Sequence, residues 1–243
     1  MSADPDVPLS GEASEALLRP VRPGNAFEDT VERLLQTIRL GVIRPGESLP
    51  PERELATRLG VSRDTVRDAI RSLAEAGYLV ARRGRYGGTF LAEELPAHTD
   101  GTEGVTREAI DDSLRLREIL EVGAARMAAT RTLTASEREE LWTRLSDVRS
   151  AKLDDYRRLD SRLHLAVAEA AGCPSLVPLV AENRMRLNGL LDQIPLLSRN
   201  IAHSDEQHEA IVMAILAGDS DAAAAAMRAH VAGSAALLHG FLD

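Results

Sequence analysis

Residues 52–79 read ERELATRLGVSRDTVRDAIRSLAEAGYL, and their spacing of apolar and turn-forming positions decides the fold of the N-terminal part. Apolar residues predict a short helix that ends at Gly60. Ser62 can cap a second helix, in which apolar residues recur at i, i+3, i+4 and i+7. This pattern is typical of a helix-turn-helix. The second helix of such a motif enters the major groove of DNA by its N-terminal end, which holds Arg63, Thr65 and Arg67.

The segments that flank this stretch extend the motif. An apolar stripe that begins at Phe27 predicts a first helix ending near Gly41. After the second helix of the motif, residues 78–81 and 89–91 have the composition of two short strands, and the glycines and arginines of RRGRYGG between them suit a hairpin tip. We therefore expect residues 25–94 to form a winged helix-turn-helix with three helices and a β-hairpin wing.

The composition favours an ordinary soluble protein with two modest domains. The chain has 243 residues and a net charge of -9, but residues 27–91 hold 11 arginines against 9 acidic residues. The acidity lies mainly in the C-terminal part, so the total does not exclude DNA binding. The sequence indicates neither a membrane span nor a secretory signal, and it holds only one cysteine. These features predict a cytoplasmic protein.

The rest of the chain divides into a tail, a linker and a second domain. Residues 1–24 hold four prolines without a sustained pattern and are interpreted as a mobile tail. Residues 95–108 are rich in Pro, Gly, Thr and acids and are interpreted as a linker. From residue 109 to 243, amphipathic helices connected by short turns predict an all-α antiparallel bundle. The predicted helices cover about residues 108–130, 135–152, 154–171, 175–197, 202–217 and 219–240. The fold class is therefore mainly α.

The run from Gly41 to Leu91 resembles the N-terminal domain of GntR-family bacterial transcription regulators, with turn, helix pair and wing in the same order. The resemblance implies that the chain binds double-stranded operator DNA. The positions that match the family's DNA contacts are Arg53, Arg63, Asp64, Thr65, Arg67 and Gly87. Asp64 stands where many relatives have a small hydroxyl residue. An acid there could accept a hydrogen bond from cytosine or repel a phosphate.

A second group of polar residues lies on the apolar faces of the predicted bundle helices. Asp160 and His164 are separated by four positions and share the face that also holds Leu163 and Val167. His208 and His230 lie on the apolar faces of two other predicted helices. Buried carboxylates and imidazoles are costly unless they are paired or bind a cation. A divalent metal would remove this cost, with zinc as the first choice and nickel or manganese as alternatives.

The other three histidines do not share this geometry. His203 is turned roughly 140° from His208, and His239 roughly 180° from His230; His98 falls in the linker. A single histidine on an apolar face is more often a hydrogen-bonded core residue than a metal ligand. That alternative stays open at this point, although an aspartate accompanies the three selected histidines.

Residues from about 110 onward are similar to the FCD ligand-binding domain of the FadR-type branch of the GntR family. The similar segments are LRLREILEVGAARMAA, DSRLH and DEQHEAIVMAILAGDSDAAAAAMRAHV. In that domain an Asp-x-x-x-His pair and two later histidines bind a metal, and the matching residues are Asp160, His164, His208 and His230. Arg117 and Glu121 match the domain's opening R-x-x-x-E.

The predicted function is that of a metabolite-responsive transcription regulator. We expect a homodimer on a palindromic operator and a small organic acid bound at the metal. Arg117, with Arg184 or Arg186, could clamp that anion, or each arginine could pair with a neighbouring glutamate. A regulator that senses the metal ion itself is the main alternative. A metalloenzyme is less favoured because no general base is placed near the cluster.

Overall fold

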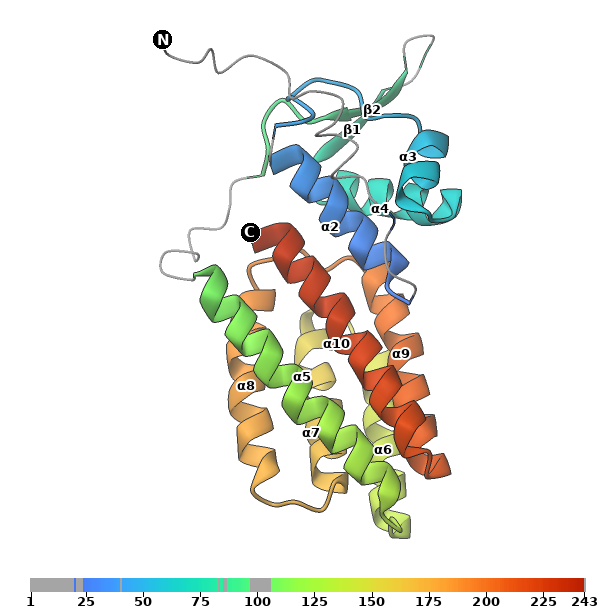
Figure 1. Ribbon diagram of the computed structural model, residues 1–243, viewed down its shortest axis with the longest axis vertical. Coiled ribbons are helices and arrows are strands. Elements are labelled where there is room, and N and C mark those ends of the chain that lie inside the picture. Colours follow the sequence, from blue (N-terminus) through green and yellow to red (C-terminus); the bar gives the residue numbers. More distant parts are fainter. Residues whose placement is uncertain are drawn as a thin grey trace. The chain divides into compact units, whose positions relative to one another are not determined.

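The computed structural model describes residue 20 and residues 24–39, 41–82, 84, 87–96 and 106–242 (Figure 1). The predicted tail lies outside these ranges apart from Pro20 and Gly24, as does most of the predicted linker. The chain divides into two compact units, one of Met1–Thr99 with His239–Asp243 and one of Asp100–Leu238. In the described residues, no helix is long and apolar enough to cross a membrane.

The N-terminal unit contains the predicted helix-turn-helix. Its helices are α2 (Ala26–Arg39), α3 (Glu52–Leu59) and α4 (Arg63–Glu75). Gly60 ends α3 with φ 67°, a left-handed conformation that favours glycine. The Oγ atom of Ser62 caps α4 by accepting a hydrogen bond from the Thr65 amide at 3.0 Å. A glycine stop and a serine cap therefore fix the turn between the two helices, as the sequence predicts.

The wing follows α4 as an antiparallel pair of strands, β1 (Leu79–Arg82) and β2 (Gly88–Leu91). The segment before α3 also pairs with β2, through an isolated bridge between Ser48 and Phe90. A side chain at Gly87 would place its Cβ 2.6 Å from the carbonyl oxygen of Arg82. The close return of the hairpin therefore requires glycine at this position.

The second unit is a bundle of helices whose order matches the predicted one. α5 packs against α7, α8 and α9, and α6 packs against α7 and α9. The bounds are α5 (Arg107–Thr130), α6 (Ala135–Arg149), α7 (Leu153–Ala170), α8 (Leu176–Leu191), α9 (Ser198–Ala217) and α10 (Ser220–Leu242), of which the residues from His239 onward are grouped with the first unit. The predicted fold class, mainly α with a winged helix-turn-helix followed by a helical bundle, is confirmed.

Two predicted helix ends are wrong. The helix predicted over residues 175–197 ends at Leu191, because Pro195 lacks an amide hydrogen and disfavours helical backbone before it. The helix predicted over residues 135–152 ends at Arg149, where the Ser150 hydroxyl donates back to the Ser146 carbonyl at 2.8 Å. The early end of α8 matters for the site, because the turn that follows it lies beside the bundle's internal cavity.

The interior of the bundle is lined by many small side chains. Alanines of α5 and α7 are buried together with leucine, valine and isoleucine from α6, α8 and α9. This core also contains polar groups that a purely apolar core would exclude. The buried charged and imidazole side chains of this unit are Arg117, Glu121, Asp160, His164, Arg184, His208 and His230.

Candidate functional site

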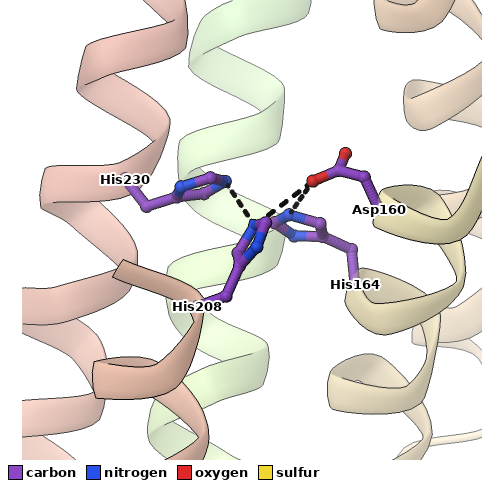
Figure 2. Close-up of side chains that lie close together, drawn as sticks. All are labelled: Asp160, His164, His208 and His230. Atoms are coloured by element: carbon purple, nitrogen blue, oxygen red, sulfur yellow. Dashed lines mark hydrogen bonds and ion pairs between the residues drawn. The ribbon is translucent and has the colours of Figure 1, made fainter. Parts of the chain in front are cut away.

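Three helices bring the four predicted metal ligands together in the centre of the bundle. α7 supplies Asp160 and His164, α9 supplies His208 and α10 supplies His230 (Figure 2). All four residues are buried, and one potential ligand atom from each lies within 4.8 Å of all the others. The structure therefore brings together in one cluster the four side chains that lie on inward helix faces.

The ligand atoms converge through the Nε2 side of the rings. His208 Nε2 lies 3.2 Å from Asp160 Oδ1 and 3.3 Å from His230 Nε2. His164 Nε2 lies 3.7 Å from the same Asp160 oxygen. In a tetrahedral zinc site with bonds of about 2.0–2.1 Å, neighbouring ligand atoms are about 3.3–3.4 Å apart. Small side-chain movements would therefore bring the cluster to coordination distance.

The protonation states of the cluster suit metal binding. Burial lowers the pKa of His208, and it lowers the pKa of His230 well below the ordinary value. Burial is the largest single effect on Asp160 and opposes its ionisation, but Arg184, His164 and His208 together outweigh it and hold the pKa of this carboxyl well below the usual range. His208 and His230 are thus neutral at neutral pH, with a lone pair free to bind a cation, while Asp160 is anionic.

A metal ion also fits the unsatisfied polar atoms of the cluster. In the part of the chain that the structure describes, neither ring nitrogen of His164 has a hydrogen-bond partner, and the Nδ1 atom of His208 has none. A buried polar atom without a partner costs roughly 1–3 kcal/mol. A bond from His164 Nε2 to a cation would remove part of this cost, so the residues present fit a divalent ion.

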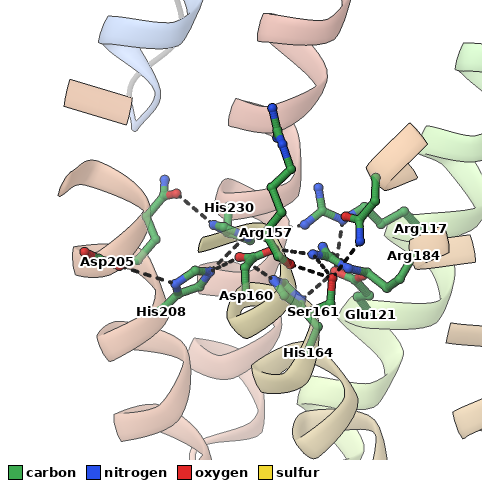
Figure 3. A network of polar contacts seen from close by, with 12 residues as sticks. Arg117, Glu121, Arg157, Asp160, Ser161, His164, Arg184, Asp205, His208 and His230 are labelled. Carbon is green, nitrogen blue, oxygen red and sulfur yellow. Dashed lines mark hydrogen bonds and ion pairs between the residues drawn. The ribbon is translucent and has the colours of Figure 1, made fainter. Parts of the chain in front are cut away.

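Charged residues of α5 and α8 lie next to the cluster (Figure 3). Arg184 pairs with Asp160 Oδ2. Arg117 Nε donates to Glu121 Oε2 at 3.0 Å, and Glu121 Oε2 also lies 2.9 Å from His164 Nδ1. The sequence indicates that Arg117 lies beside Glu121, but it does not predict contacts of Glu121 with His164 or of Arg184 with Asp160. Their partners lie on different helices, so no local spacing could have indicated these two contacts.

The predicted effector arginines separate into two groups. Arg117 and Arg184 are buried and line an internal cavity of about 40 Å³ together with Asp160 and His230. Arg186 is exposed and pairs with Glu182 at 2.6 Å, one turn earlier in α8. The structure therefore brings Arg117 and Arg184 to the cluster and leaves Arg186 at the surface.

The predicted DNA-contacting side chains lie in the first unit. Arg53 and Gly87 are exposed, and Arg63, Asp64 and Arg67 are exposed in the first turns of α4. Thr65 is half-buried and its hydroxyl lies 2.8 Å from that of Ser62. Arg67 Nη1 lies 2.9 Å from Asp64 Oδ1, and Nη2 lies 3.3 Å from Glu52 Oε2. Asp64 therefore contacts the side chain predicted to read the operator.

These features define a class of protein: a transcription regulator in which one chain carries a winged helix-turn-helix and a helical sensor domain. Residues 27–91 match the bacterial regulatory proteins of the gntR family, and residues 112–233 match the FCD domain. The chain belongs to the GntR family, in the FadR-type branch that carries an FCD domain. It is a regulator and not an enzyme.

Curated relatives agree with this assignment. A proposed regulatory protein of the L-lactate dehydrogenase operon of Escherichia coli (strain K12) is 30% identical over 233 residues, covering 87% of this chain and 85% of that protein. The regulator LutR of Bacillus subtilis (strain 168) is 28% identical over 217 residues, covering 85% and 98%. Among solved structures, a GntR protein of Streptococcus agalactiae has 27% identity and a TM-score of 0.47, covering 86% and 98%.

The cluster makes a direct prediction about metal content. Replacing both His164 and His230 with alanine should abolish zinc retention, because two of the four convergent ligands are lost. His203→Ala should retain zinc, since His203 is on α9 but lies outside the cluster. Zinc per chain is measured by mass spectrometry after dialysis. Equal zinc in wild type and both variants would contradict the assignment of these ligands.

Proposed function

We propose that this chain is a metabolite-responsive repressor or activator that binds a palindromic operator as a homodimer. In this proposal a divalent metal, zinc first, is held by Asp160, His164, His208 and His230. A small carboxylate effector binds beside the metal and changes the affinity for DNA. The effector can do so only by the difference in its affinity for the DNA-competent and the incompetent states.

The observation that carries the proposal is the charge balance of the bundle centre. Arg117 and Arg184 are almost fully buried, and so are Glu121 and Asp160. Two cations and two anions cancel, and His208 and His230 are neutral because burial lowers the pKa of each ring. A divalent ion would add two positive charges to a buried site. Uncompensated buried charge is costly, so the metal-loaded site favours an anion.

The contacts of Arg117 also support an anionic effector. Its Nη1 atom is buried and has no hydrogen-bond partner within the described residues, and its side chain lines the internal cavity. Guanidinium groups recognise carboxylates through paired hydrogen bonds. Arg117 and Arg184 are therefore proposed to hold the carboxylate, with Arg186 left out because it is exposed and paired with Glu182.

The name of one relative supports a particular kind of acid. That relative is named for an L-lactate dehydrogenase operon. L-Lactate is a small hydroxycarboxylate, and its two oxygen groups can bind one metal ion together. It is the first effector to test, followed by other small carboxylates.

A metal sensor is the second candidate function. Four protein ligands can complete the tetrahedral shell of zinc without an open position, and the cluster offers four ligand atoms. In that case the ion itself would change the affinity for DNA, and the carboxylate would have no role.

An effector titration separates these two functions. We expect L-lactate or another small carboxylate to change the operator affinity of zinc-loaded protein by about 5- to 150-fold, measured by fluorescence anisotropy. Arg117→Met should lose the response, because the unpaired guanidinium nitrogen is removed. Arg115→Met, at an exposed arginine of the same helix paired with Asp111, should keep it. Affinity that follows zinc but no acid would establish the metal sensor.

The recognition helix allows a test of base contact. Arg67→Ala should weaken binding to a palindromic duplex, selected from random sequences with this protein, by about 1–3 kcal/mol. Arg71→Ala is the matched control, since Arg71 is exposed one turn later and pairs with Glu75; its effect should stay within about 0.5 kcal/mol. An unchanged affinity of the Arg67 variant would remove this residue from the contact surface.

The proposed dimer has a candidate interface on the bundle. Ile119 in α5 is 71% exposed and Met185 in α8 is 76% exposed, and these two helices pack together. Exposed large apolar side chains are characteristic of interaction surfaces. Aspartate at both positions should convert the dimer to a monomer in sedimentation experiments, whereas Met213→Asp on α9 should not. A dimer that survives the double substitution would exclude this face as the interface.

A further inference from the structure

We infer that Glu121 is a positioning residue that orients the His164 ring for metal binding. Its carboxylate would hold the proton of His164 on Nδ1 and leave the Nε2 lone pair directed at the other ligands. The inference rests on the proposed metal centre. It assigns a specific role to a residue of α5, a helix that contributes no ligand of its own to the cluster.

The geometry of His164 is the first step. A neutral imidazole carries one proton, and the nitrogen that carries it cannot bind a metal. His164 Nε2 is the nitrogen that lies beside Asp160 Oδ1, at 3.7 Å, while Nδ1 lies 2.9 Å from Glu121 Oε2. An anionic oxygen at this distance favours the proton on Nδ1. The Nδ1–H bond is not aligned with the oxygen, so a rotation of the ring would complete the hydrogen bond.

The other two imidazoles have weaker partners on their Nδ1 side. His230 Nδ1 lies 3.1 Å from the amide oxygen of Gln207, which is neutral. His208 Nδ1 lies 4.0 Å from a carboxylate oxygen of Asp205, which is 20% exposed. Glu121 is 2% exposed and lies closest to its imidazole. Among the three, it combines negative charge, burial and short distance.

The charge of Glu121 is maintained by its neighbours (Figure 3). Arg117 donates to Oε2 from one turn earlier in α5, and Arg184 Nη1 lies 3.8 Å from Oε1. Burial raises the pKa of this carboxyl, but Arg117, His164 and Arg184 together lower it well below the ordinary value. Glu121 is therefore an anion held in place between the cluster and two guanidinium groups.

A purely structural role as the partner of Arg117 makes different predictions. If Glu121 only neutralises Arg117, replacing both charges with apolar groups of similar size would leave metal binding intact, because such replacements of buried pairs are often tolerated. If Glu121 positions His164, the same replacement removes the Nδ1 acceptor. Partners of this kind typically contribute 10- to 100-fold in metal affinity.

Three variants of the whole 243-residue chain test the inference. Glu121→Gln keeps an oxygen acceptor but removes the charge, and we expect zinc affinity to fall about 10-fold. The double variant Arg117→Met with Glu121→Leu removes the pair without leaving one buried charge alone, and we expect a fall of about 100-fold. Glu118→Gln is the matched control, because Glu118 is one turn away on α5 and pairs with Arg228 at the surface; it should bind zinc as the wild type does.

Two measurements give the readout. Zinc affinity comes from competition with a chromophoric chelator, and folding is checked by thermal denaturation. The His164 tautomer comes from long-range nitrogen–proton correlation spectra of zinc-free protein. Wild type and Glu118→Gln should carry the proton on Nδ1, and the double variant should shift it toward Nε2.

The outcomes distinguish the positioning role of Glu121 from the proposed metal centre on which it rests. Folded Glu121 variants with unchanged zinc affinity and an unchanged tautomer would overturn the positioning role while leaving the metal centre intact. A wild type that binds no zinc would overturn the proposed metal centre and the positioning role with it. Reduced affinity in both Glu121 variants, with a shifted tautomer in the double variant, would support the inference.

Discussion

The burial of four charged groups in an apolar helical bundle is the constraint on which the second unit depends. Arg184 pairs with Asp160, and Arg117 pairs with Glu121. Removing one partner of such a pair leaves an uncompensated buried charge, at a cost of about 3–5 kcal/mol. The Arg184–Asp160 pair joins α8 to α7, and Glu121 joins α5 to both helices through Arg184 and His164. Since alanines form much of the surrounding core and offer few interlocking side chains, the ion pairs contribute strongly to the register of the helices.

Local signals explain why the first unit could be predicted from the sequence. The stop at Gly60, the cap at Ser62 and the apolar spacing of α4 all act within a few residues. The Asp160 and His164 pair is likewise local, because residues four apart share a helix face. The inward direction of His208 and His230 follows from helical periodicity, although only the structure brings the three helices together.

Contacts between distant segments could not be predicted in the same way. Glu121 reaches His164 from another helix, and Arg184 reaches Asp160 across 24 positions. The sequence indicates Glu121 only as the neighbour of Arg117. It does not distinguish Arg184 from Arg186 as a candidate to bind the effector anion. Tertiary packing separates these two arginines, because the side chain of Arg184 is 3% exposed and that of Arg186 is 56% exposed. A two-residue step along a helix turns a side chain by about 200°.

The charge balance also bears on how a metal and an anion would act together. The four buried side chains Arg117, Arg184, Glu121 and Asp160 sum to zero charge, so a divalent ion alone would leave two positive charges in a buried site. An anion alone would leave negative charge there. Each ligand would therefore reduce the electrostatic cost of binding the other, and such coupling is reciprocal by thermodynamic necessity. A metal-sensing and a metabolite-sensing regulator would then differ in which ligand varies in concentration, while the same buried residues carry both responses.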